Sequence, residues 1–207
     1  MKRCVIIGGA PIENYERIKK FLQDDDFYIY CDSGLNHIDS LGKKPNLIVG
    51  DFDSHSNPNM DVETIVLPRA KDDTDTTFAA KQGIERGFEE FILIGVTGGR
   101  IDHTLGNIYL LQYLYKHGKK GILIDNFSEC EIIDSSPAYV KDCYPYFSLV
   151  NISGIAKGIT IKNAKFPLDN AEIIPEYQYG VSNEVLKGKT AEISVKEGSL
   201  LLIKDII

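Results

Sequence analysis

The sequence predicts an α/β domain with a mostly parallel sheet and helices on both faces, followed by a small all-β sandwich. Two observations lead to this fold class. In residues 1–128, short apolar runs that end in glycine or aspartate alternate with segments of helical periodicity. In residues 129–207, short β-type runs are separated by glycines, and no long helical period occurs. No low-complexity linker separates the two parts, so we expect two packed domains, 1–128 and 129–207.

In the first domain, the limits of each element follow from its apolar spacing and from the glycines and prolines that close it. Parallel strands joined by helices place their carboxyl ends at one edge of the sheet, where ligands bind. Acidic residues and glycines gather at the expected strand ends. The expected strands are residues 3–7, 27–31, 47–49, 62–67, 91–95 and 121–124, and the expected helices are residues 13–22, 35–41, 75–86 and 104–117.

In the second domain, every expected element is a short strand. Glycines and polar residues lie between the apolar runs, as in small sandwiches or barrels. The expected strands are residues 131–134, 146–152, 158–162, 171–174, 191–195 and 199–203.

Composition narrows the classes of function. The 207 residues are 43% hydrophobic and carry a net charge of −7, and no basic run is present. These features argue against nucleic acid as a main partner. No apolar segment approaches the roughly 20 residues that a membrane-spanning helix needs. The four cysteines lack CxxC spacing, so we expect reduced thiols. The apolar run near the N-terminus is too short for a signal peptide, and we therefore expect a cytoplasmic protein.

The most unusual stretch is residues 47–54. Three apolar residues lead into Gly50 and then into two carboxylates, Asp51 and Asp53. If the chain stays extended, both carboxylates point the same way and repel each other unless a cation lies between them. A magnesium ion that bridges to a phosphate is the commonest use of such a pair. A solvated acidic turn is the alternative, and this stretch alone leaves both interpretations open.

A second acidic stretch, residues 71–77, opens an expected helix. Asp72 or Thr74 can cap that helix by accepting backbone hydrogen bonds. Capping accounts for one acid and leaves a surplus, since Lys71 is followed by three acids within five residues. Asp75 is therefore a candidate third carboxylate for the same metal.

Residues 98–103 join an expected strand to an expected helix. Gly98 and Gly99 let an anion approach the backbone, and the N–H groups at a helix start favour phosphate. Arg100 can bind phosphate oxygens through two parallel hydrogen bonds. The alternative is a glycine turn with an exposed arginine. His103 is a weaker candidate, because it can also brace the helix start.

Three further segments contain polar or aromatic residues that are candidates for ligand binding. Asp32 and Asn36 are four residues apart, so they either share one side of a helical turn and bind a nucleotide, or form a cap and an exposed polar residue. Taken alone, residues 180–184 are typical of a surface loop. Taken alone, Phe166 is typical of a core residue.

Taken together, these motifs resemble the bacterial thiamine pyrophosphokinases over nearly the whole chain. The resemblance rests on residues 31–36, 50–54, 71–76, 98–107 and 180–184, in that order and spacing. It implies an α/β domain, a C-terminal β-sandwich, and a homodimer with its active site in a cleft between subunits. It also implies the transfer of a diphosphate from ATP to the hydroxyl of thiamine, with release of AMP.

The resemblance assigns a role to each candidate residue. The implied Mg²⁺ carboxylates are Asp51, Asp53, Asp75 and, as a further candidate, Asp72. The residues implied to lie near the nucleotide are Asp32, Asn36, Lys71, Thr74, Gly98, Gly99, Arg100 and His103. Asp102 is implied to lie near the substrate, Ser182 and Asn183 in the loop that contacts thiamine, and Phe166 against its pyrimidine ring. The proton acceptor stays open between Asp102 and a metal-site acid.

Two other functions compete with this one. An apolar strand followed by Asp51-Phe52-Asp53-Ser54 is similar to the haloacid dehalogenase pattern, although there the aspartate follows the first strand. A nucleotide-sensing module without catalysis is the other. Release of phosphate from simple phosphomonoesters favours the first, and nucleotide binding without AMP formation favours the second.

Overall fold

The computed structural model describes residues 3–52, 60–70 and 72–206. The chain divides into two compact units, Met1–Asn126 and Phe127–Ile207. The first contains helices and strands and the second contains strands, which confirms the predicted order of an α/β unit and a β unit. The division falls after Asn126, whereas the sequence analysis puts the boundary after residue 128.

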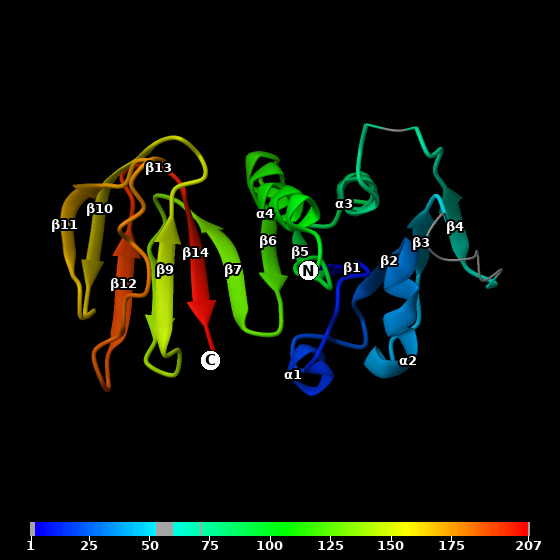
Figure 1. The fold of residues 1–207 in the computed structure, drawn as a ribbon, viewed down its shortest axis with the longest axis horizontal. Helices are drawn as coiled ribbons and strands as arrows, with labels where there is room; N and C mark the ends of the chain where they lie inside the picture. Colours follow the sequence, from blue (N-terminus) through cyan, green and yellow to red (C-terminus); the bar gives the residue numbers. More distant parts are fainter. Residues whose placement is uncertain (1–2, 53–59, 71, 207) are drawn as a thin grey trace. The chain divides into compact units, whose positions relative to one another are not determined.

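The first unit is built on a sheet whose neighbouring strands are all parallel, in the order β4-β3-β2-β1-β5-β6 (Figure 1). In the central register, Val5 of β1 lies opposite Tyr28 of β2 and Ile92 of β5. The carboxyl ends of these strands therefore meet at one edge. The strands are β1 (Arg3–Ile7), β2 (Phe27–Cys31), β3 (Leu47–Gly50), β4 (Glu63–Val66), β5 (Glu90–Ile94) and β6 (Lys120–Ile124).

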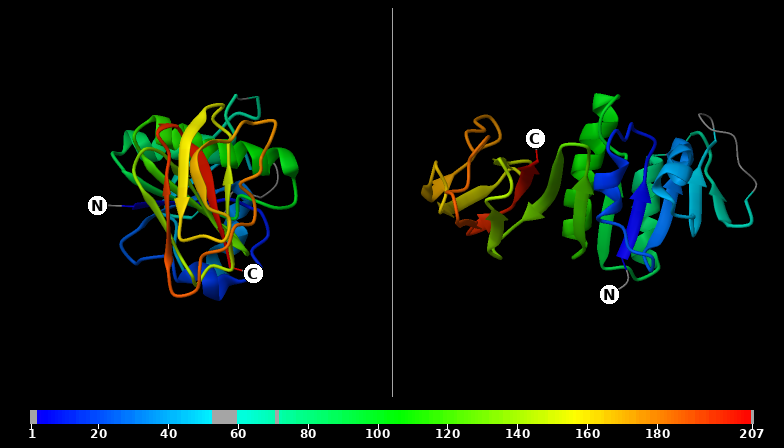
Figure 2. Two further views of the ribbon diagram at one scale, coloured as in Figure 1. Left: turned by 90° about the vertical axis from the view of Figure 1, so that its left-hand side faces the viewer. Right: turned by 90° about the horizontal axis from the view of Figure 1, so that it is seen from below.

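Helices pack on both faces of this sheet (Figure 2). Ile18 of α1 and Leu41 of α2 share an apolar cluster with Val5. On the other face, Gly83 of α3 lies so close to Phe91 that a Cβ at residue 83 would be 2.5 Å from its ring. The helices are α1 (Tyr15–Lys19), α2 (Ile38–Leu41), α3 (Asp75–Glu85) and α4 (Ile101–Lys116), and a 3₁₀ helix, η1 (Asp32–His37), precedes α2.

Some helix limits differ from the prediction. The helix expected at 13–22 is α-helical only at Tyr15–Lys19, because the N–H groups of Lys20, Phe21 and Leu22 bond to carbonyls three residues earlier, as in a 3₁₀ turn. The segment expected as a helix at 35–41 is part of η1 followed by α2. Helix α4 begins at Ile101, before the expected residue 104.

The second unit consists of two antiparallel sheets, β7-β14-β9 and β11-β10-β12-β8, with β13 paired to β10. Phe147 and Leu202 from the first sheet share a buried core with Ile161 and Ile193 from the second. The strands are β7 (Ser128–Ile133), β8 (Ala138–Lys141), β9 (Tyr146–Val150), β10 (Ala156–Lys162), β11 (Leu168–Glu172), β12 (Thr190–Ser194), β13 (Glu197–Gly198) and β14 (Leu200–Asp205).

In the second unit, strands β8 and β13 have no counterpart among the expected strands, and β11 begins earlier than expected. Strand β8 buries only Val140 and lies at the edge of its sheet. Strand β11 begins at Leu168 rather than at residue 171, and its pairing with β10 is interrupted by register shifts. Asn170 in this strand has φ 48°, which breaks the alternation on which strand prediction depends.

Within the described residues, no helix is long and apolar enough to span a membrane. All four cysteines are described, and none of them forms a disulfide.

Candidate active site

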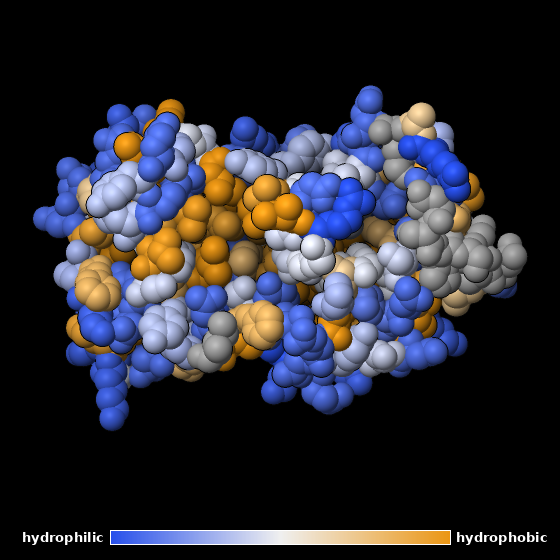
Figure 3. Space-filling view, viewed as in Figure 1, coloured by the Kyte–Doolittle hydropathy of each residue, from blue (hydrophilic) through white to orange (hydrophobic). Residues whose placement is uncertain are grey.

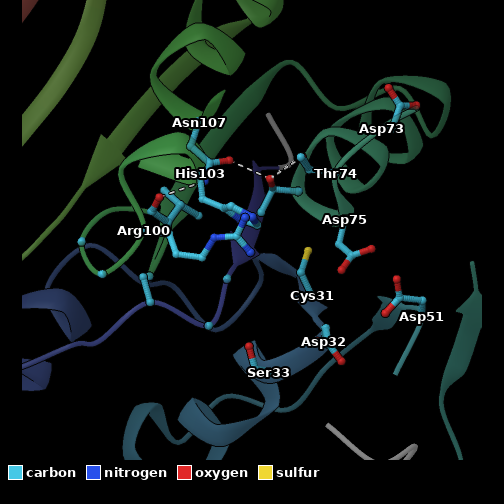
Figure 4. Close-up of a pocket in the computed structure, with 18 of the residues that line it drawn as sticks. Cys31, Asp32, Ser33, Asp51, Asp73, Thr74, Asp75, Arg100, His103 and Asn107 are labelled. Carbon is cyan, nitrogen blue, oxygen red and sulfur yellow. Dashed lines mark hydrogen bonds between the residues drawn. The ribbon is translucent and has the colours of Figure 1, made fainter. Parts of the chain in front are cut away.

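A cavity of about 800 Å³ lies in the first unit, at the carboxyl ends of its parallel strands (Figure 4). The segments after β1, β2, β3 and β5 and the first turns of α3 and α4 surround it. Most of the residues predicted to bind metal or nucleotide are here. Lining residues include Gly8, Gly9, Asp32, Ser33, Asp51, Arg69, Asp72, Thr74, Asp75, Gly98, Gly99, Arg100, His103 and Asn107.

Three carboxylates converge in this cavity. Oxygen atoms of Asp32, Asp51 and Asp75 all lie within 4.8 Å of one another. Asp32 is buried and the other two are half-buried, and Figure 4 shows the Asp51 and Asp75 side chains facing each other. The sequence analysis placed Asp51 and Asp75 together and assigned Asp32 to the nucleotide. The available signal for Asp32 was its position at the end of β2, the parallel neighbour of β3.

The backbone explains how Asp32 reaches Asp51. Gly50 lies against Asp32, since a Cβ at residue 50 would be 3.1 Å from the Asp32 Cβ. Asp32 itself has φ 42° and Phe52 has φ 54°. A common direction for Asp51 and Asp53 is expected only if the chain stays extended. Phe52 does not meet this condition, because β3 ends at Gly50 and Phe52 has a left-handed conformation.

The donor set suits a hard divalent cation. Three carboxylates at this spacing repel one another in the absence of positive charge, and oxygen ligands are those that Mg²⁺ prefers. Asp72, a predicted further ligand, is exposed and lines the cavity but does not belong to this group of three. Asp53 and Lys71, which the sequence analysis also assigned to the site, lie outside the described residues.

Backbone rather than side chains forms the side of the cavity next to β1 and β5. The Gly8 N–H donates to the Ile94 carbonyl at 2.9 Å, and the Ala10 N–H donates to Gly95 at 2.8 Å. A Cβ at Gly8 would lie 2.6 Å from the Gly95 oxygen. Only glycine permits this approach, so the two loops present a smooth backbone surface to a ligand.

The start of α3 holds Asp75 in place. Thr74 is the N-cap, as predicted, and its Oγ1 accepts from the Thr77 N–H at 3.2 Å. Asp73 forms an ion pair with Lys81 at 2.6 Å and points away from the other acids in Figure 4. Of the acids that open this helix, Asp75 is therefore the one that contributes to the carboxylate group.

The loop from Gly98 to His103 carries the predicted phosphate ligand. Gly98 and Gly99 have φ 90° and 68°, a region that glycine tolerates best. Arg100 forms a two-point contact with Asp102, with Nη2–Oδ2 at 2.6 Å and Nε–Oδ1 at 3.2 Å. Both side chains are exposed. The hydrogen bond from Arg100, helped by one from the His103 N–H, lowers the pKa of Asp102 to about 2.

Two predicted residues of this unit do not line the cavity. Asp102 faces Arg100, as described. Asn36 is exposed and lies outside the cavity lining. Of the two alternatives for Asp32 and Asn36, a shared side of a turn requires α-helical spacing, whereas η1 has about three residues per turn and rotates a residue four positions on to another side. The exposed Asn36 fits the other alternative, an exposed polar residue.

Arg69, Thr76 and Asn107 are among the cavity residues to which the sequence assigned no role. Arg69 is an exposed cation directly after Pro68 and before the acidic stretch. Thr76 and Asn107 are buried and bonded to each other, with Thr76 Oγ1 donating to Asn107 Oδ1 at 2.6 Å. Both lie in stretches that carry the family resemblance, 71–76 and 98–107, but their contact with each other could not be predicted, because it arises from the packing of α3 against α4.

In the second unit, the three residues predicted to contact thiamine lie together. The buried Asn183 side chain brackets Phe166, since Oδ1 accepts from the Phe166 N–H at 3.1 Å and Nδ2 donates to its carbonyl at 2.8 Å. The Phe166 side chain is exposed. Ser182 has φ 59°, and its N–H donates to Ser148 Oγ at 3.0 Å. Asn183 therefore braces the exposed ring.

The comparisons with known proteins cover both units. Residues 18–123 match the family model described as the thiamin pyrophosphokinase catalytic domain, and residues 130–200 match that of its vitamin B1 binding domain. The thiamine pyrophosphokinase of Bacillus subtilis (strain 168) is 27% identical over 212 residues, covering 99% of each chain.

Solved structures share the fold. A thiamine pyrophosphokinase structure from Bacillus subtilis matches with a TM-score of 0.87 at 24% identity, over 99% of both chains. One from Geobacillus thermodenitrificans matches with a TM-score of 0.81 at 26% identity, over 98% of this chain and 97% of the other. Because the catalytic-domain model matches more than half of the chain and the carboxylates converge beside the cavity, we conclude that this chain belongs to the thiamin pyrophosphokinase family.

Proposed function

We propose that the chain transfers a diphosphate group from ATP to the hydroxyl of thiamine and releases thiamine diphosphate and AMP. The observation that carries this proposal is the group of three carboxylates at one side of a glycine-walled cavity. Family membership supports the same reaction, and it leaves the phosphatase and the sensing module without support.

Asp32, Asp51 and Asp75 are the residues that would hold Mg²⁺, with Asp53 and Asp72 as further candidates. Mg²⁺ bound there would neutralise phosphate charge, which phosphoryl-type transfer needs more than covalent catalysis. The protein's own contribution is to fix the carboxylates on separate strand ends and a helix start. This arrangement is preorganised, so little rearrangement accompanies binding.

The nucleotide phosphates would lie between the carboxylate group and the loop from Gly98 to Arg100. The start of α4 favours an anion, although the Gly98 N–H already donates to Thr104 Oγ1 at 3.1 Å and the His103 N–H donates to Asp102 at 2.9 Å. Arg100 is exposed, so its guanidinium can exchange Asp102 for phosphate oxygens as the nucleotide binds. We assign Thr74, His103 and Lys71 to the same nucleotide.

Asp102 is a poor candidate for the proton acceptor while it is paired with Arg100. Its pKa of about 2 makes it a weak base at neutral pH. We keep Asp102 as a residue near the substrate and assign it the role of holding Arg100 in place before the nucleotide arrives.

For thiamine, we propose two loops of the second unit, the β10–β11 loop with Phe166 and the β11–β12 loop with Ser182 and Asn183. The exposed Phe166 ring offers a face on which a flat heteroaromatic ring can stack. The two hydrogen bonds from Asn183 fix the backbone of Phe166, so the ring is held ready. Ser182, next to it, would supply a polar contact.

We also propose that the protein is a cytoplasmic homodimer. Hydrophobic residues are visible at the surface of the second unit (Figure 3). Large exposed side chains of this unit include Tyr177, which is 67% exposed, and Val181, which is 53% exposed. Surfaces of this kind commonly mark contacts with another protein. Sedimentation velocity at micromolar concentration is expected to give a dimer of the 23.1 kDa chain, and a monomer would contradict the proposal.

The decisive experiment is an incubation of the purified protein with MgATP and thiamine, followed by separation of the products. Equal amounts of AMP and thiamine diphosphate are expected, and both should disappear when Mg²⁺ is chelated. Release of phosphate from p-nitrophenyl phosphate without ATP would favour the phosphatase instead. Nucleotide binding without AMP formation in the presence of thiamine would favour the sensing module.

A further inference from the structure

Asn107 is a buried amide in the wall of the cavity. It lies on α4 and is 5% exposed. Burying a polar side chain is unfavourable unless its hydrogen-bonding groups are used, so its partners indicate what it does.

Both ends of the Asn107 amide are bonded, each to a different element. The Nδ2 atom donates to the Val96 carbonyl at 2.8 Å, and Oδ1 accepts from Thr76 Oγ1 at 2.6 Å (Figure 4). A backbone carbonyl can only accept, which sets the orientation of the amide. One side chain on α4 thereby joins the first turn of α3 to the segment that follows β5.

The bond to Thr76 bears directly on Asp75. The Thr76 hydroxyl has one hydrogen, which goes to Asn107, so its oxygen is left as an acceptor toward Thr74 Oγ1 at 3.1 Å. Asp75 lies between these two threonines in the chain. Its backbone is thus fixed on one side by the N-cap and on the other by the bond to Asn107.

The bond to Val96 bears on the opposite wall. Val96 follows Gly95, whose backbone packs against Gly8, and precedes the loop with Gly98 and Gly99. The Asn107 amide therefore links the first turn of α3, which carries Asp75, to the segment that leads into the loop with Gly98 and Gly99.

We propose that Asn107, acting through Thr76, is a positioning residue that holds Asp75 in the arrangement needed for metal and nucleotide binding. This inference rests on the proposed function, because it takes Asp75 to be a metal ligand. Residues that orient a ligand from behind commonly change metal affinity by about 10–100-fold. Asn107 acts one bond further away, so a change of about three- to tenfold is expected.

The test measures binding of Mn²⁺, a paramagnetic substitute for Mg²⁺, in the presence of the non-hydrolysable nucleotide α,β-methylene-ATP. Asn107→Ala is expected to weaken Mn²⁺ binding about five- to tenfold, and Thr76→Val about threefold. Thr76→Ser keeps the hydroxyl and is expected to retain wild-type affinity. The KM for thiamine is expected to stay within about twofold of wild type in all three.

A matched control is Asn151→Ala in the second unit. Asn151 is 3% exposed, and its Nδ2 also donates to a backbone carbonyl, that of Ile173, at 2.6 Å. This variant is expected to lower the melting temperature without changing Mn²⁺ affinity. If Asn107→Ala behaves in the same way, or if Thr76→Val binds Mn²⁺ as tightly as wild type, the positioning role is overturned.

These measurements separate the inference from the proposed reaction. If the wild-type protein binds Mn²⁺ and the analogue but forms no thiamine diphosphate, the proposed reaction fails, and weakened Mn²⁺ binding in the variants still supports the role of Asn107. If the wild-type protein binds no Mn²⁺ with the analogue present, the role of Asn107 is overturned together with the metal assignment.

Discussion

At the scale of single residues, the carboxylate group depends on one unusual backbone conformation. Asp32 has φ 42°, a region that aspartate tolerates better than most residues. Its side chain is buried beside two more carboxylates. Conformations of this kind persist where the surroundings enforce them, and they gather at functional sites. Gly50 leaves room for Asp32 here, since a Cβ at residue 50 would lie 3.1 Å from the Asp32 Cβ.

Removing one charge from this group tests the metal assignment. Asp51→Asn and Asp75→Asn are each expected to lower kcat by about 10²-fold or more, because charge neutralisation at the phosphates is the main catalytic term. Thermal melting is expected to show a folded protein, since the exchange relieves repulsion among the three acids. The control is Asp73→Asn, which breaks the ion pair with Lys81 outside the group.

Asp73→Asn is expected to keep kcat within a few-fold of wild type. Full activity of Asp51→Asn, or an equal loss in Asp73→Asn, would contradict the assignment of the metal to these carboxylates.

The ion pair of Arg100 and Asp102 makes a prediction about pH. The pKa of Asp102 is lowered from an ordinary value of 3.8 to about 2, chiefly by the hydrogen bond from Arg100. Its contribution to stability is therefore present above pH 3.8 and is lost as the pH falls through about 2. An NMR titration of the Asp102 carboxyl is expected to have its midpoint near that value, and Arg100→Gln is expected to raise it.

At the scale of secondary-structure elements, patterns of apolar residues predicted what local sequence controls. All strands of the first unit were placed correctly within a residue or two. Most of them are largely buried runs closed by Gly or Asp, and the partly exposed edge strand β4 is marked by Pro68 after it. The 3₁₀ conformation of η1 and the edge strand β8 were missed. Both depend on neighbours far away in the chain, through the packing of Gly34 against the Ile7 carbonyl and the pairing of β8 with β12.

The site shows the same division. Asp51, Thr74 and Arg100 were predicted as site residues because a carboxylate, a hydroxyl and a guanidinium each indicate a particular kind of ligand or contact. The joining of Thr76 to Asn107 and the approach of Asp32 to Asp51 were not predicted, because they arise only when separate elements pack. Tertiary contacts of this kind leave no periodic signal in a single sequence.

A buried histidine connects three elements of the first unit and gives a prediction about stability. His37 is 7% exposed, with Nδ1 2.7 Å from the Tyr15 hydroxyl and Nε2 3.1 Å from the Ala10 carbonyl. It thus joins η1 to α1 and to the loop that lines the cavity. Burial lowers the pKa of His37 below its ordinary value of 6.5.

Because the folded state resists protonation of His37, its contribution to stability is present above pH 6.5 and is lost as the pH falls below that value. The urea midpoint is expected to fall between pH 7 and pH 5, and His37→Gln is expected to reduce this slope. His117→Gln, which changes an exposed histidine at the end of α4, is expected to retain it. A wild-type slope in His37→Gln would contradict the prediction.

At the scale of the whole molecule, two units with separate cores carry the two halves of the proposed reaction. The apolar cluster of Val5 and Ile48 supports the strand ends that present the acids. The cluster of Phe147 and Ile161 supports the loops that hold Phe166. Each unit also matches its own family model, one catalytic and one for vitamin B1 binding. Changes in one unit should therefore affect one substrate.

Phe166→Ala tests whether a change in the second unit affects thiamine and leaves the nucleotide unaffected. Loss of a stacking face worth about 1 kcal/mol, together with lost apolar contact, is expected to raise the KM for thiamine about tenfold. The dissociation constant of α,β-methylene-ATP is expected to stay unchanged, because the residues proposed to bind the nucleotide lie in the first unit. The matched control is Tyr139→Ala, since Tyr139 is an aromatic residue of the same unit that is 62% exposed, against 57% for Phe166. It is expected to leave both constants at wild-type values. A change in nucleotide affinity in Phe166→Ala, or an equal rise in KM in Tyr139→Ala, would mean that the ring does not act as a separate platform for thiamine.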